Sequence, residues 1–189
     1  FYTPREIVQY MVNESLVAHL KRTVDDKLED KFRQLLDFTT QEVELTDEQK
    51  RQIIHALFTC KILDPACGSG AFPMGMLQQM VHILRQVDPK NEQWREVLLD
   101  MASDDSRRAF GIADEEERNK KLDEIKNTFN NALNSPDYTR KLYIIESCIY
   151  GVDIQPIAML ITRLRFFITL ICEQNDIMRN KPEENFGIK

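Results

Sequence analysis

The sequence has no long hydrophobic run and no recognisable export signal. Its longest apolar stretch, near residues 157–171, is interrupted by Thr162, Arg163 and Arg165, so it is too short and too polar to cross a bilayer. The first residues lack the basic start and the apolar middle of a secretory signal. We therefore expect a cytoplasmic protein without a membrane partner.

Paired cysteines and an excess of basic residues are also absent. The cysteines show no Cys-x-x-Cys spacing and no neighbouring histidine, which argues against a metal site and against a disulfide framework; they are Cys60, Cys67, Cys148 and Cys172. The chain carries 25 Lys and Arg against 31 Asp and Glu, a net charge of −6. A chain of this charge is not expected to grip a phosphate backbone by itself.

The 189 residues and their 42% hydrophobic content suffice for one core, with or without a helical annex. Apolar residues at three- and four-residue steps predict helices at 4–20, 26–38 and 46–58. Capping-box signatures open the first helix at Thr3-Pro4-Arg5-Glu6 and the third at Thr46-Asp47-Glu48-Gln49. Residues 1–60 are thus predicted to form an N-terminal helical region.

Two strand-and-helix units follow this region. A short apolar run at 61–64 enters a glycine loop and then a helix at 71–87, and a second strand at 148–153 precedes a helix that Pro156 can open. Helical periodicity predicts three helices in the insertion at 88–147, and the second unit occupies 148–189. The order predicts an α/β fold with two parallel strands.

The loop Gly68-Ser69-Gly70 lets a ligand approach the backbone closely, although a tight turn alone explains such a pair equally well. A P-loop would require Lys and then Ser or Thr after its last glycine, where this chain has Ala71-Phe72. A dinucleotide fingerprint would require a third glycine, where Pro73 stands. Phosphate and NAD sites are therefore disfavoured.

Each predicted strand ends in a carboxylate. Asp64 would repel a pyrophosphate, but it suits a ligand with an ammonium group. Asp153 stands where an acid typically accepts both hydroxyls of a ribose, although it could instead cap the helix that Pro156 opens. Together the two acids favour a ligand that joins adenosine to an amino acid.

Three ordered motifs resemble those of the adenine-N6 DNA methyltransferases of restriction-modification systems. They are Phe1-Tyr2-Thr3-Pro4, Asp64-Pro65-Ala66-Cys67-Gly68-Ser69-Gly70-Ala71-Phe72 and Gly151-Val152-Asp153-Ile154. The likeness is greatest to the methylase region of type IIG restriction enzymes, with type II methylases and type I modification subunits also similar. It implies a partial class I S-adenosylmethionine (SAM)-dependent, Rossmann-like fold, with N-terminal helices and a helical insertion.

The resemblance also implies roles for individual residues around SAM. It places the start of the first helix near the methionine carboxylate, Asp64 near the amino group, Asp153 on the ribose and Ile154 against the adenine. The full set of cofactor-binding residues that it implies is Phe1, Tyr2, Thr3, Pro4, Asp64, Ala66, Gly68, Ser69, Gly70, Phe72, Asp153 and Ile154. Thr3 also has a purely structural explanation in its capping box, and Cys67 is expected to be a small loop residue.

The sequence departs from that family in one respect. It has no Asn- or Asp-Pro-Pro-aromatic motif, which holds the target adenine in the family, so no catalytic residue is assigned. We therefore expect a SAM-binding fragment whose partners are the rest of a methylase polypeptide, DNA bound through that rest, and in the type IIG case a fused nuclease. The alternatives are a methyltransferase acting on RNA or protein, and a non-catalytic helical module with a vestigial cofactor pocket.

Overall fold

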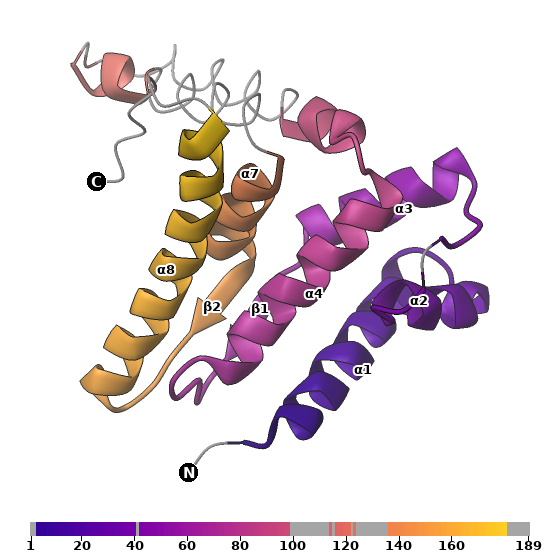
Figure 1. The fold of residues 1–189 in the computed structure, drawn as a ribbon, viewed down its shortest axis with the longest axis horizontal. Coiled ribbons are helices and arrows are strands. Elements are labelled where there is room, and N and C mark those ends of the chain that lie inside the picture. The colour runs from indigo at the N-terminus through magenta and orange to yellow at the C-terminus, as the bar shows by residue number, and fades with distance from the viewer. Residues whose placement is uncertain are drawn as a thin grey trace.

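A computed structural model describes residues 3–40, 42–98, 114, 116–121, 123 and 136–180 (Figure 1). Most of these residues are helical, and two short strands pair in parallel. The elements are α1 (Arg5–Thr23), a 3-10 turn (Asp26–Leu28), α2 (Glu29–Leu36), α3 (Asp47–Phe58), β1 (Ile62–Asp64), α4 (Ala71–Val87), α7 (Pro136–Tyr143), a π-helical turn (Ile144–Cys148), β2 (Ile149–Gly151) and α8 (Pro156–Asn180). This mostly helical arrangement with a two-stranded parallel sheet is compatible with the predicted partial α/β fold.

The two predicted capping boxes have different outcomes. At α3 the Thr46 hydroxyl accepts the Gln49 N–H at 3.2 Å, and the Gln49 side chain accepts the Thr46 N–H at 3.0 Å, as predicted. The box at Thr3 is wrong, because α1 begins at Arg5 with Pro4 as its N-cap residue. Proline has no side-chain acceptor, so the carbonyl of Pro4 takes the Ile7 N–H at 3.1 Å instead.

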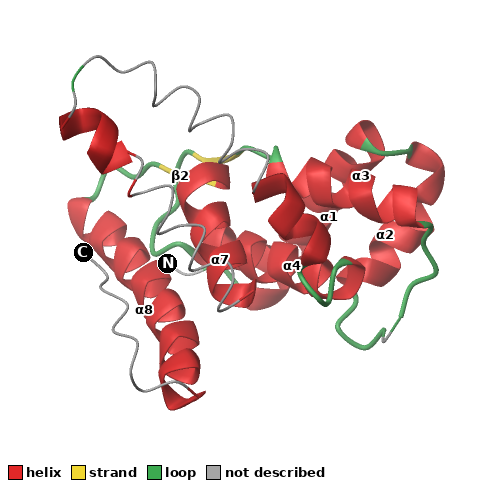
Figure 2. Ribbon diagram, turned by 90° about the horizontal axis from the view of Figure 1, so that it is seen from above, coloured by secondary structure: helices red, strands yellow, loops and turns green. Residues whose placement is uncertain are grey.

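Helix α4 lies between the N-terminal helices and the second strand-and-helix unit, as Figures 1 and 2 both show. Its residues Leu77, Met80, Ile83 and Leu84 are completely buried. The N-terminal half of α1 packs closely against α4, since a Cβ added at Gly75 would lie 3.0 Å from a methyl group of Val12. The core therefore joins the N-terminal helices to the strand-and-helix units.

The two strands pair in parallel with Ile62 opposite Ile149 and Asp64 opposite Gly151. Ile62 is buried in the core, whereas Leu63 is 64% exposed, so the side chains of β1 alternate between the two faces of the sheet. The second strand is shorter than predicted because Cys148 ends the π-helical turn. This register sets the ends of the two strands, and hence the loops that follow them, side by side.

A buried cluster of charged side chains ties the two ends of the insertion together. Arg140 in α7 is 1% exposed; it donates to the main-chain oxygen of Asp88 and, at 3.3 Å, to the carboxylate of Asp137. The Asp88 carboxylate caps the next helical segment by accepting the Trp94 N–H at 2.8 Å. Burial lowers the pKa of Arg140, and the carboxylates of Asp137 and Asp88 oppose that shift.

The described residues cover only part of the helices predicted for the insertion. Residues 92–98 and 116–121 are helical, and α7 corresponds to the third predicted helix. Most of the second predicted helix, at 122–133, lies outside the described residues. No helix in the described residues is long and apolar enough to cross a membrane.

Replacing Arg140 with Met is expected to lower the free energy of unfolding by about 3–5 kcal/mol, because the substitution leaves Asp88 buried without its cation. Urea denaturation followed by circular dichroism measures the change. Arg51→Met is the matched control, since Arg51 pairs with Glu48 while both side chains are more than 60% exposed; it should cost less than about 0.5 kcal/mol. Equal losses in the two variants would contradict the structural role of Arg140.

Candidate cofactor-binding site

The described parts of the three sequence motifs lie at the same end of the molecule. The start of α1, the loop between β1 and α4, and the start of α8 all lie at the lower end in Figure 1. The start of α1 lies there because α1 packs closely on α4. A Cβ at Gly75 would approach Val8 and Val12, and the Gln9 side chain donates to that of Gln79 at 3.3 Å. The structure thus joins segments that are far apart in the sequence.

Backbone hydrogen bonds continue the pairing of the strands into the glycine loop. The Val152 N–H donates to the Asp64 carbonyl at 2.9 Å, and the Cys67 N–H donates to the Val152 carbonyl at 3.0 Å. The Gly70 N–H then donates to the Cys67 carbonyl at 2.8 Å, which closes a turn. Helix α4 begins at the next residue, Ala71. The loop is therefore held against the segment that follows β2.

The two positions of the loop that hold glycine favour it for different physical reasons. Both have positive φ, +53° at Gly68 and +80° at Gly70, which favours glycine at each position. A Cβ at Gly68 would meet no atom within 4 Å, whereas one at Gly70 would lie 2.8 Å from the Thr162 side chain. Gly68 thus faces open space that a ligand can occupy, and Gly70 allows α8 to approach the loop.

Asp153 connects the glycine loop to the start of α8. One carboxylate oxygen accepts the Gly68 N–H at 2.9 Å, and the other accepts the Gln155 N–H at 2.8 Å. The second bond is the local turn expected of an aspartate shortly before a helix, so a structural role accompanies any role with a ligand. Each carboxylate oxygen has a further lone pair, and the half-buried side chain can still accept hydroxyl groups.

Asp64 ends β1 opposite Gly151 of β2. One of its oxygens accepts the Ala66 N–H at 3.1 Å, and the side chain is partly exposed. Burial raises the pKa of the Cys67 thiol, and the negative charges of Asp64 and Asp153 raise it further. The site therefore favours neutral or positively charged groups over a thiolate or another anion.

The other predicted residues divide between open and packed positions. Thr3, Pro4 and Ala66 are exposed, and Ile154 is 96% exposed. Phe72 packs against the core and lines a groove of about 510 Å³ between α1 and β1. Phe1 and Tyr2 lie outside the described residues.

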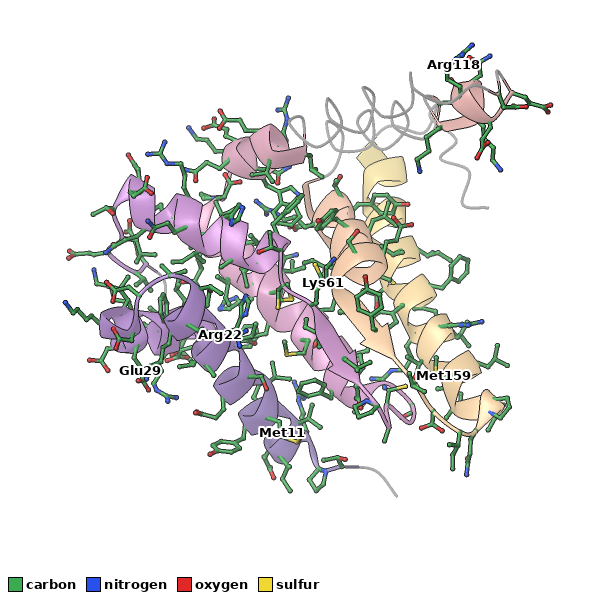
Figure 3. All side chains as sticks on the ribbon, turned by 180° about the vertical axis from the view of Figure 1, so that it is seen from behind. Met11, Arg22, Glu29, Lys61, Arg118 and Met159 are labelled. Carbon is green, nitrogen blue, oxygen red and sulfur yellow. The ribbon has the colours of Figure 1, made fainter. Side chains whose placement is uncertain are left out.

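Three residues of α8 also contact the loop, and none of them was identified from the sequence. The Met159 sulfur lies 3.5 Å from the Cys67 sulfur, Thr162 donates to the Gly68 carbonyl at 2.9 Å, and Arg165 donates to the Ser69 carbonyl at 2.7 Å (Met159 is labelled in Figure 3). The available signal was the interruption of an apolar helical stretch by Thr162 and Arg165. In the sequence alone, those polar residues indicate only that the stretch does not span a membrane.

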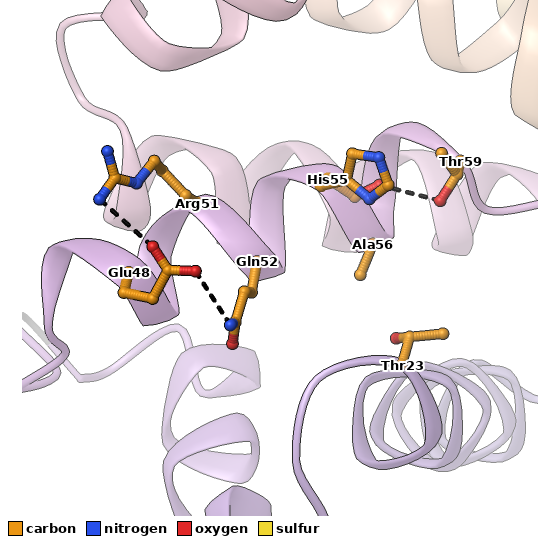
Figure 4. A pocket seen from close by; sticks show the side chains of 7 residues that line it. All are labelled: Thr23, Glu48, Arg51, Gln52, His55, Ala56 and Thr59. Carbon is orange, nitrogen blue, oxygen red and sulfur yellow. Dashed lines mark hydrogen bonds and ion pairs between the residues drawn. The ribbon is translucent and has the colours of Figure 1, made fainter.

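A separate groove of about 460 Å³ lies between α1 and α3 (Figure 4). Its polar groups largely satisfy one another, since Glu48 contacts Arg51 at 3.2 Å and Gln52 at 3.0 Å. It contains none of the predicted cofactor-binding residues, and no group of three potential metal ligands occurs anywhere in the described part of the chain.

A search of curated proteins finds similarity to a protein of Methanocaldococcus jannaschii named "Putative type II restriction enzyme and methyltransferase". The two are 25% identical over 187 residues, and the match covers 90% of this chain but only 12% of that protein. The chain thus corresponds to a small part of a much longer relative. No family model matches the chain. No solved structure matches it either.

The cysteines should differ in their reactivity toward iodoacetamide at pH 7.5. Cys172 is exposed, whereas burial raises the pKa of Cys60 and Cys67 and raises that of Cys148 to about 11. A raised pKa reduces the thiolate fraction at neutral pH, so Cys67 should react on the order of tenfold more slowly than Cys172 and accelerate as the pH rises through its pKa.

Peptide mass spectrometry after timed labelling measures these rates. Protein unfolded in urea is the control, and in it all four cysteines should react at similar rates. If Cys67 in the folded protein reacts as fast as Cys172, the packed position assigned to the Cys67 thiol is wrong.

Proposed function

We propose that this chain is the SAM-binding part of a site-specific DNA methyltransferase that modifies adenine N6 within a restriction-modification system. The observation that carries the proposal is the arrangement of Asp64, the open face of Gly68, and Asp153 at the ends of two paired parallel strands. Ligands of open α/β sheets bind beyond the carboxyl ends of the strands, which is where these groups lie. The core would then be the first part of a class I methyltransferase fold.

The chemistry of the site fits the parts of SAM. The sulfonium and ammonium groups of SAM are positive, and the carboxylates of Asp64 and Asp153 provide the complementary charge. Free lone pairs on Asp153 can accept ribose hydroxyls, and the exposed Ile154 offers an apolar surface to the adenine ring. The start of α1 adds unpaired backbone amides, which favour a carboxylate.

The comparison with the archaeal protein agrees with this proposal, because the name of that relative joins a restriction enzyme to a methyltransferase. The chain matches only 12% of the relative, so the activity of the whole protein is a proposal here. Adenine N6 as the acceptor rests on the resemblance of the three sequence motifs to the adenine-N6 enzymes. DNA binding and the acceptor pocket would be supplied by other residues of the polypeptide, since the sequence lacks the Pro-Pro motif and carries a net charge of −6.

Asp64→Asn should weaken the binding of SAM roughly tenfold to a hundredfold, because the variant loses a charge-assisted bond to the ammonium group. The amide oxygen of the new side chain can still accept the Ala66 N–H, so the loop should keep its shape. Calorimetry with SAM and with its desamino analogue tests the assignment, with Asp30→Asn as a control at an exposed acid of α2. Equal losses for the two ligands would place the ammonium group elsewhere.

The 189-residue chain should bind SAM without methylating DNA. An adenine must leave the duplex and enter a pocket before its N6 can react, and the motif that forms this pocket in the resembled family is absent from the chain. Incorporation of tritiated methyl groups into mixed-sequence duplex DNA compares the chain with its full-length parent polypeptide. Transfer by the 189 residues alone would show that an acceptor site exists within them.

A further inference from the structure

The glycine loop is held by α8 as well as by the strands. Both backbone groups of Gly68 form hydrogen bonds. Its N–H donates to the Asp153 carboxylate, and its carbonyl accepts from the Thr162 hydroxyl. The next carbonyl, that of Ser69, accepts from the Arg165 guanidinium at 2.7 Å. Thr162 and Arg165 are one helical turn apart and lie on one face of α8, so a single helix aligns both donors.

Close packing places Thr162 against the glycine loop. The side chain is 5% exposed, and its methyl carbon would lie 2.8 Å from a Cβ at Gly70. The hydroxyl oxygen of Thr162 would lie 2.9 Å from the same Cβ, so the absence of a side chain at Gly70 lets Thr162 approach the loop and donate to the Gly68 carbonyl. Gly70 and Thr162 are therefore complementary in shape.

The bond from Thr162 also orients the amide that follows. In a trans peptide the carbonyl and the N–H point in opposite directions, so a Gly68 carbonyl that faces α8 turns the Ser69 N–H away from α8. That N–H belongs to the same turn as the open face of Gly68. It is thus presented as a donor to an oxygen atom of a ligand that covers the loop.

We propose that Thr162, with Arg165, is a positioning residue of the cofactor site, which orients the peptide between Gly68 and Ser69 before the cofactor binds. The proposal rests on the proposed function for the identity of the ligand, but the geometry of the loop can be tested without any ligand. Preorganisation of a binding loop increases affinity because less conformational freedom is lost on binding. Removing the hydroxyl should therefore weaken binding even though Thr162 does not contact the ligand.

The test compares Thr162→Val, which keeps the shape and loses the hydroxyl, with Thr162→Ser, which keeps the hydroxyl. Thr169→Val is the matched control, because Thr169 on the same helix donates only to the carbonyl of Arg165 one turn earlier. Amide hydrogen exchange of residues 66–70 is measured without ligand, and SAM affinity is measured by calorimetry. We expect faster exchange and about five- to tenfold weaker binding for Thr162→Val, recovery with Thr162→Ser, and no change with Thr169→Val.

Arg165→Met is a second variant. It should keep the protein folded because the Arg165 side chain is exposed, and it should also accelerate amide hydrogen exchange in the loop. Wild-type exchange and wild-type affinity in Thr162→Val would overturn the proposal, and so would a Thr162→Ser variant that behaves like Thr162→Val. If the wild-type protein does not bind SAM, the proposed function fails. In that case the exchange data still decide whether α8 holds the loop.

Discussion

The parallel register of β1 and β2 is the constraint on which the rest of the site depends. With Asp64 opposite Gly151, the glycine loop and the segment around Asp153 leave the sheet together and exchange two backbone hydrogen bonds. A pair of three-residue strands is too small to be stable alone. The register is maintained by packing on α4 and by the buried contact of Arg140 with Asp88, which closes the insertion between the strands.

Asp153 keeps hydrogen-bonding capacity for a ligand beside its structural role. Its two bonds to Gly68 and Gln155 hold the loop and the start of α8 in the absence of any ligand. A carboxylate has about four lone-pair directions, so these bonds leave capacity for ribose hydroxyls. The helix-capping role and the cofactor role, which compete as explanations in the sequence, are therefore compatible in the structure.

Local signals in the sequence predict the structure more reliably than long-range ones. The bounds of α4 and the capping box of α3 were predicted as observed, because the glycine loop and the Thr46–Gln49 pair act within a few residues. The start of α1 was placed one residue early, since the Thr3 signature does not reveal that Pro4 occupies the cap. Arg140, Thr162 and Arg165 could not be assigned, because their partners at Asp88, Gly68 and Ser69 are 52, 94 and 96 positions away.

The two faces of helix α8 differ in their surroundings. One face carries Met159 and Thr162 against the loop, and the other leaves a row of large apolar side chains partly exposed, namely Ile157, Leu160, Ile161, Leu164, Phe167 and Ile168. Because the loop is held by α8, and α8 follows β2, the arrangement of the loop depends on the pairing of β2 with β1. Contacts of such long sequence separation carry a large loop-closure cost, and the buried contact of Arg140 with the Asp88 carbonyl is one of the interactions that offset it.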